Sequence, residues 1–73
     1  MAIQVVMNHA GDTRHYFDRN DPEGLARAER RFKELIDQGF TAAVRVGAGE
    51  VSRIRAFDPA AEETLFLPRL VGG

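Results

Sequence analysis

The last residues of the chain are the strongest candidates for chemistry. Gly72 and Gly73 close the sequence and follow the run Pro68-Arg69-Leu70-Val71. Glycine allows another molecule to approach the backbone closely, so a diglycine end suits a narrow channel in a partner enzyme, where its carboxylate can be activated. The competing interpretation is an ordinary frayed terminus.

Two histidines form the next candidate group. His9 and His15 flank Asp12, and together they suggest a metal or an acid–base site. A convincing metal site needs more converging ligands. We therefore expect His9 to be a turn residue and His15 a strand residue, with no metal.

Two shorter motifs favour ordinary structure over chemistry. The segment Gly47-Ala48-Gly49 lacks the third glycine of a dinucleotide loop, and a strand rather than a helix follows it, so we expect a tight turn. Glu62-Glu63 is expected to be solvated charge on a loop. The sequence therefore predicts no catalytic residues and no cofactor.

Composition excludes several functional classes. The 73 residues carry a net charge of -1 and contain no cysteine, so thiol chemistry, zinc–thiolate sites and disulfides are excluded for this chain. The charge balance gives no reason to expect nucleic acid or an anionic membrane as a partner. We find no signal-peptide pattern and no membrane-spanning run, and we expect a cytoplasmic monomer.

The elements that would position the tail begin with a hairpin and a helix. Residues 3–7 and 13–17 read as two short strands joined by a turn. Asp21 is suited to cap a helix that begins at Pro22 and ends at Gly39. The apolar residues of this helix recur with helical period. They are Leu25, Ala28, Phe32, Leu35 and Ile36.

The opposite face of the helix is charged. Glu23 and Arg27, Glu29 and Lys33, and Arg30 and Glu34 are each four residues apart, a spacing at which each pair is able to form an ion pair. Glutamates that alternate with the arginines at positions 27, 30 and 31 argue against a nucleic-acid surface.

A second hairpin and a last strand complete the domain. Residues 40–46 and 51–57 are predicted strands, residues 59–63 a short helical turn, and residues 64–67 the final strand. Since one helix can cover one face of a mixed sheet, we predict an α+β fold of the β-grasp type, with the final strand between the first and the third. Residues 1–67 form this domain and residues 68–73 a flexible tail. The predicted core is Ile3, Val5, Phe17, Leu25, Ala28, Phe32, Leu35, Ile36, Val44, Ile54, Leu65 and Leu67.

The chain resembles ubiquitin and its relatives. The resemblance covers the order of elements over nearly the whole length and the first strand, Met1-Ala2-Ile3-Gln4-Val5-Val6, with Gly11 in its hairpin. Its most specific part is Thr64-Leu65-Phe66-Leu67 followed by Arg69-Leu70-Val71-Gly72-Gly73. The β-grasp fold alone is weak support for a function, because many functions share it.

The resemblance implies a protein modifier. An activating enzyme would adenylate the carboxylate of Gly73 and take it as a thioester, a conjugating enzyme would join it to a lysine of a target protein, and an isopeptidase would reverse that bond. Gly72 would accompany Gly73 into the active site, and Arg69, Leu70 and Val71 would be recognised by the activating enzyme. In bacteria such proteins are encoded beside these enzymes, and some of the operons resemble antiphage defence systems.

Three departures from ubiquitin narrow this expectation. Val71 stands where ubiquitin has an arginine, and Pro68 stiffens the tail, so we expect a dedicated activating enzyme with an apolar channel. Lys33 is the sole lysine, which favours single modification over lysine-linked chains. An apolar docking patch like that of ubiquitin is expected on the outward face of the sheet, at Val6, Tyr16, Ala43 and Phe66.

Two other functions fit the same residues. A sulfur carrier for cofactor synthesis has the same fold and diglycine but ends as a thiocarboxylate. A plain β-grasp binding domain would not use its glycines at all. Removing Gly72 and Gly73 separates this last possibility from the other two.

Overall fold

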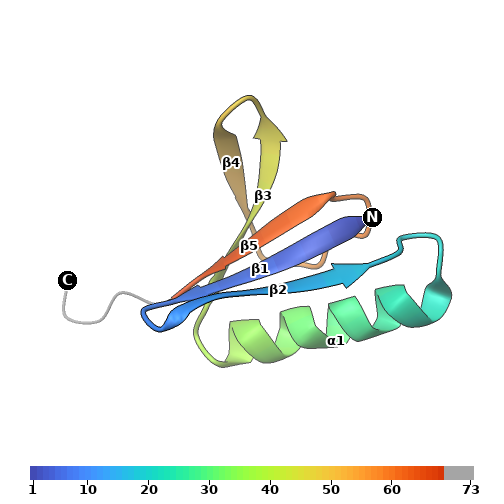
Figure 1. The fold of residues 1–73 in the computed structure, drawn as a ribbon, viewed down its shortest axis with the longest axis horizontal. Coiled ribbons are helices and arrows are strands. Elements are labelled where there is room, and N and C mark those ends of the chain that lie inside the picture. Colours follow the sequence, from blue (N-terminus) through green and yellow to red (C-terminus); the bar gives the residue numbers. More distant parts are fainter. Residues whose placement is uncertain (69–73) are drawn as a thin grey trace.

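A computed structural model describes residues 1–68 as one helix beside a five-stranded sheet (Figure 1). The elements are β1 (Ala2–Asn8), β2 (Gly11–Phe17), α1 (Pro22–Asp37), β3 (Thr41–Gly47), β4 (Glu50–Ile54) and β5 (Glu63–Leu67). No helix within the described residues is both long and apolar enough to cross a membrane.

The sheet has the strand order β2-β1-β5-β3-β4. β5 runs parallel to β1 and antiparallel to β3, and both hairpins are antiparallel. The prediction that the last strand lies between the first and the third is confirmed. The α+β class is confirmed as well, and the arrangement is compatible with a β-grasp-like fold.

The helix begins and ends where the sequence predicts. The side chain of Asp21 accepts a hydrogen bond from the backbone N–H of Glu23 at 3.2 Å, and Pro22 occupies the first turn. At the other end Gly39 has a φ of 98°, which glycine adopts at low cost. The N–H of Phe40 then donates to the carbonyl of Leu35 at 3.0 Å, so the chain turns directly into β3.

The core lies between the helix and one face of the sheet. Phe66 is fully buried on β5, and its ring meets that of Phe32 from α1 edge-on, with centroids 5.6 Å apart. Val6 and Ala42 complete this cluster from the neighbouring strands. Phe57 packs against the cluster from the loop after β4. This cluster therefore joins β1, β3 and β5 to the helix.

A glutamine occupies the same face. Gln4 is 0% exposed, and its Nε2 donates to the carbonyl of Ala28 at 3.0 Å while its Oε1 accepts from Nη1 of Arg31 at 2.8 Å. Both ends of the amide are thus hydrogen-bonded, which removes most of the cost of burying it. Gln4 fixes β1 to α1.

Several predictions about local structure are wrong. Residues 59–63 form no helix, because the carboxylate of Asp58 accepts from the N–H of Ala60 and closes a turn instead. β4 ends at Ile54, three residues before the predicted end. Leu67, a predicted core residue, is 38% exposed, since it lies on the sheet face away from the helix.

Candidate functional site

The residues expected to be activated lie outside the described part of the chain. These are Gly72 and Gly73, with Arg69, Leu70 and Val71 before them. The described site is therefore the surface from which they depart, where β5 ends at Leu67 and Pro68 follows.

This departure point is fixed by the middle strand of the sheet. β5 has hydrogen-bonded neighbours on both sides, with Val6 beside Phe66 and Thr41 beside Leu67. Phe66, one residue before the exit, is fully buried. Pro68 has no N–H to extend the ladder. Strand pairing therefore continues on β5 up to Leu67, directly before the exit.

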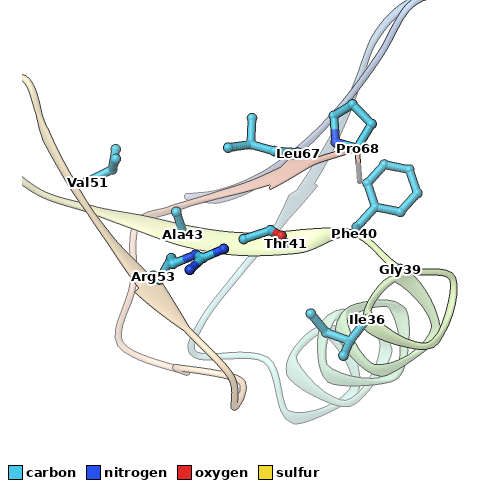
Figure 2. A pocket seen from close by; sticks show the side chains of 9 residues that line it. All are labelled: Ile36, Gly39, Phe40, Thr41, Ala43, Val51, Arg53, Leu67 and Pro68. Atoms are coloured by element: carbon cyan, nitrogen blue, oxygen red, sulfur yellow. The ribbon is translucent and has the colours of Figure 1, made fainter. Parts of the chain in front are cut away.

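An apolar groove adjoins the exit (Figure 2). It encloses about 670 Å³ between the end of α1, β3, β4 and the end of β5. Leu67 and Pro68 form one side, Val51 lies on the opposite side, and Ile36 and Phe40 close it next to the helix. Gly39, Thr41, Ala43 and Arg53 complete the lining.

The charge beside the groove is positive. Arg53 lines it from β4, and Arg55 lines an adjoining hollow of about 450 Å³ with Phe40. Nearby, Nε of Arg45 binds the carboxylate of Glu63 at 2.9 Å, which ties β3 to β5. The groove thus offers apolar contact with cationic side chains at its edge, and among the described residues the hydroxyl of Thr41 is the one polar uncharged side-chain group in its lining.

The predicted docking patch is wrong for two of its four members. Val6 and Phe66 face the helix and belong to the core, because β1 and β5 direct their even-numbered residues inward. Tyr16 is 64% exposed, and Ala43 is 3% exposed. These two lie on the outer face but on strands separated by β1 and β5, so the four residues form no common surface.

The histidines do not come together. His9 is in the turn after β1, and His15 is on β2, as expected. Burial first, and then the charge of Arg31, lower the pKa of His15 below 6.5. Within residues 1–68 no three histidine or carboxylate side chains gather as a metal cluster.

The glycine segment forms a turn, as predicted. β3 ends at Gly47, Ala48 and Gly49 make the turn with Gly49 at a φ of 79°, and β4 begins at Glu50. No helix follows to bind a phosphate.

Sequence reasoning missed the groove itself. Val51 and Leu67 are exposed apolar residues on neighbouring parts of the outer face, at 50% and 38%. Only the pairing of β3 with both β4 and β5 brings them to one groove. The available signal was the position of Pro68, which marks where the ladder must stop.

Comparison with known proteins does not assign the chain to a family. No family model matches the chain, and no curated protein or solved structure matches it. Its function therefore has to be argued from its own residues.

Proposed function

We propose that this protein is a ubiquitin-like modifier of the β-grasp type, whose Gly73 carboxylate is activated and then joined to lysines of target proteins. The observation that carries the proposal is the central position of β5, which leads straight from the buried core to Pro68. The sequence after it, Arg69-Leu70-Val71-Gly72-Gly73, has no side chain at its last two positions.

The chemistry requires no catalytic group from this chain. The carboxylate attacks the α-phosphate of ATP and releases pyrophosphate, and a thiolate of the activating enzyme then displaces AMP to form a thioester. A lysine amine attacks that thioester, which forms an amide and releases the thiol. The modifier supplies the carboxylate and a surface by which the enzyme holds it.

The apolar groove is lined by Leu67 and Pro68, which directly precede the tail in the sequence. An enzyme that binds the five residues after Pro68 meets Leu67 and Val51 at the exit. Both side chains are exposed, so contact with the enzyme would bury them at little structural cost. The groove therefore supports recognition by an activating enzyme that presents apolar side chains to Leu67 and Val51.

The test is adduct formation with a candidate activating enzyme and ATP. The intact chain is expected to form an adduct that thiols release, and removal of Gly72 and Gly73 is expected to abolish it. An adduct that persists after this removal would contradict the proposal, and so would the absence of any adduct with an enzyme encoded beside this protein.

A matched pair of variants tests the groove separately. Leu67→Asp is expected to lower adduct formation about tenfold or more, while Tyr16→Asp, at a more exposed site on the far edge strand, is expected to leave it unchanged. Equal effects of the two variants would exclude the groove as the enzyme's contact while leaving the role of the tail intact.

A further inference from the structure

The apolar groove beside the end of β5 continues into a basic hollow. The groove encloses about 670 Å³ and the hollow about 450 Å³. Both are lined by Ile36, Phe40, Thr41 and Arg53, so they form one surface that runs from the end of β5 to β4 (Figure 2). Arg55 lines its far part. The surface is therefore apolar where the tail leaves the fold and positive at its far end.

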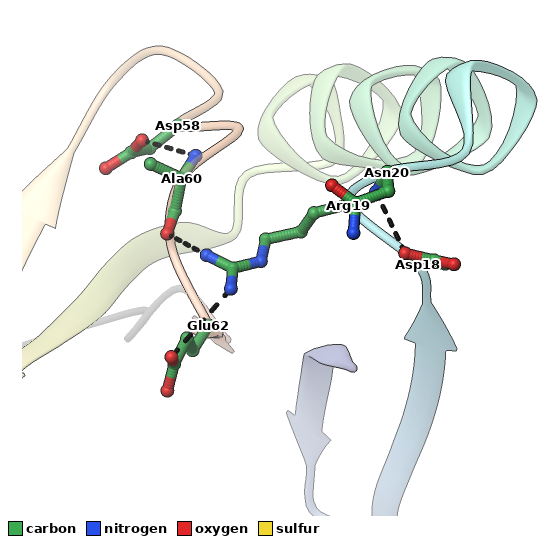
Figure 3. A network of polar contacts seen from close by, with 6 residues as sticks. All are labelled: Asp18, Arg19, Asn20, Asp58, Ala60 and Glu62. Carbon is green, nitrogen blue, oxygen red and sulfur yellow. Dashed lines mark hydrogen bonds and ion pairs between the residues drawn. The ribbon is translucent and has the colours of Figure 1, made fainter.

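The two arginines at the far end differ from an arginine elsewhere in the fold. Arg19 donates to the carbonyl of Ala60 at 2.8 Å and lies 3.9 Å from the carboxylate of Glu62 (Figure 3). By contrast, no carboxylate among residues 1–68 lies within salt-bridge distance of Arg53 or Arg55. No acidic residue of that part of the chain lines the groove or the hollow. The described residues thus leave two cations on this surface without a countercharge.

The residues that follow Pro68 have a complementary composition. Leu70 and Val71 are apolar, and Gly73, the last residue of the sequence, carries a carboxylate. Apolar contact and a carboxylate bound by arginine are both favourable interactions. Because Gly72 and Gly73 have no side chains, this carboxylate can approach a guanidinium group closely. The tail and the groove therefore match in order, with apolar groups first and opposite charges at the far end.

The tail is long enough to cross the groove. Leu67 pairs with Thr41 of β3. Arg53 of β4 pairs with Ala43, two residues further along the same strand. Leu67 and Arg53 are therefore two strands and two residues apart, which is about 12 Å at ordinary sheet spacings. Five extended residues span at most about 17 Å. The surplus allows the chain to turn back over the end of β3 after Pro68.

We propose that residues 69–73 dock onto this groove in the free protein, with their apolar side chains at its near end and the terminal carboxylate between Arg53 and Arg55. Arg69 then lies where the tail leaves the fold, on the other side of β3 from these two cations. The short connection gives the tail an effective concentration in the millimolar range at its own groove. At micromolar protein concentrations the tail therefore meets its own groove rather than that of a second copy.

A docked tail opposes activation by an enzyme. The groove is the surface by which the activating enzyme is proposed to hold this protein, and the docked tail covers it. The enzyme therefore has to displace the tail before it can bind both the groove and the carboxylate of Gly73. This consequence rests on the proposed function, whereas the docking itself requires no partner.

The test compares the full chain with a chain that lacks Gly72 and Gly73, at micromolar concentration and without enzyme or ATP. Chemical shifts of the backbone amides report on the groove. We expect the removal to shift the amides of Val51 and Arg53 on β4, which lie far along the sequence from the cut, and to leave those of β2 unchanged. Changes confined to Pro68 and the residues after it would overturn the proposal.

Two double variants test the role of charge. In Arg53→Gln/Arg55→Gln, removal of the two glycines is expected to shift the amide of Val51 about threefold less, because the carboxylate has lost its partners. Arg14→Gln/Arg27→Gln removes the same charge from β2 and α1 and is expected to keep the full shift. Equal shifts in the two variants would overturn the contact with the carboxylate. Shifts that grow with protein concentration would overturn docking within one chain, by assigning the groove to the tail of a second copy.

The adduct test distinguishes this proposal from the modifier proposal. Normal adduct formation by a chain that shows no shifts on β4 would refute the docking and leave the modifier proposal intact. Shifts on β4 in a chain that forms no adduct would support the docking and contradict the modifier proposal.

Discussion

The Oε1 atom of Gln4 accepts a hydrogen bond from Nη1 of Arg31 at 2.8 Å across the interface between sheet and helix. With the bond from Nε2 to the carbonyl of Ala28, it satisfies a side chain that is fully buried. A polar residue thus stands in the middle of the core-facing side of β1, and it is bound by an arginine at the margin of α1.

Two substitutions of Gln4 distinguish how much its hydrogen bonds and its buried volume each contribute to the free energy of unfolding. Gln4→Ala is expected to lower the free energy of unfolding by about 2–4 kcal/mol, because it removes both hydrogen bonds and leaves a cavity. Gln4→Leu fills most of that space, and the half-buried Arg31 can turn to water, so its cost is expected to be about 1 kcal/mol. Urea unfolding measures both. A larger loss for leucine than for alanine would contradict this account of the core.

Neighbouring residues of β5 test which face is buried. Phe66→Ala is expected to cost about 3–5 kcal/mol, because it empties the centre of the core. Leu67→Ala, one residue along and on the outer face, is expected to cost less than about 1 kcal/mol. Similar losses of unfolding free energy for the two variants would contradict the placement of Phe66 in the core and Leu67 on the outer face.

The end of the helix depends on backbone conformation. Gly39 has a φ of 98°, so Gly39→Ala is expected to lower the free energy of unfolding by about 1–2 kcal/mol. Gly47 provides the control, since a β-carbon there would meet nothing within 4 Å and its φ is not positive. Gly47→Ala is expected to cost less than about 0.5 kcal/mol by thermal unfolding. An equal loss at both positions would contradict the role of Gly39.

His15 makes stability depend on pH. Since its folded-state pKa lies below its ordinary value of 6.5, the unfolded chain takes up a proton more readily. Its contribution is therefore complete above about pH 6.5 and is lost as pH falls through the folded-state pKa. Between about pH 7.5 and pH 5.5 the free energy of unfolding is expected to fall less in His15→Gln than in the unmodified protein. His9 is exposed, and His9→Gln is expected to show the same fall as the unmodified protein. An unchanged fall in His15→Gln would rule out this cause.

Much of the fold could be predicted because its signals are local. Asp21 and Pro22 start the helix, Gly39 ends it, and Pro68 stops the last ladder, each for a reason that lies in the residue itself. The position of the last strand followed from the need to cover one helix with one sheet.

The faces of the strands could not be predicted in the same way. A polar residue in an apolar strand normally points to water, so Gln4 suggested that Ile3 and Val5 face the helix. Contacts with Ala28 and Arg31, more than twenty residues away, reverse this. The segment Thr64-Leu65-Phe66-Leu67 carries no alternation beyond its first residue, so its burial depends on the same distant contacts. The docking patch failed for this reason.

Of the three ion pairs that the helix spacing permits, only Lys33 with Glu29 forms within residues 1–68. A spacing of four residues permits Arg30 to meet Glu34, but a solvated pair gains little and does not fix long side chains. Arg31 instead meets Gln4, a partner that helix spacing alone does not reveal.

The most direct test of the modifier proposal is mass spectrometry of tryptic peptides from cells that express the protein. Cleavage after Arg69 is expected to leave Leu-Val-Gly-Gly on lysines of target proteins, and this remnant is expected to vanish when Gly72 and Gly73 are removed. The proposal is contradicted if no such remnant is found while the purified protein carries sulfur at Gly73, because the chain would then be a sulfur carrier.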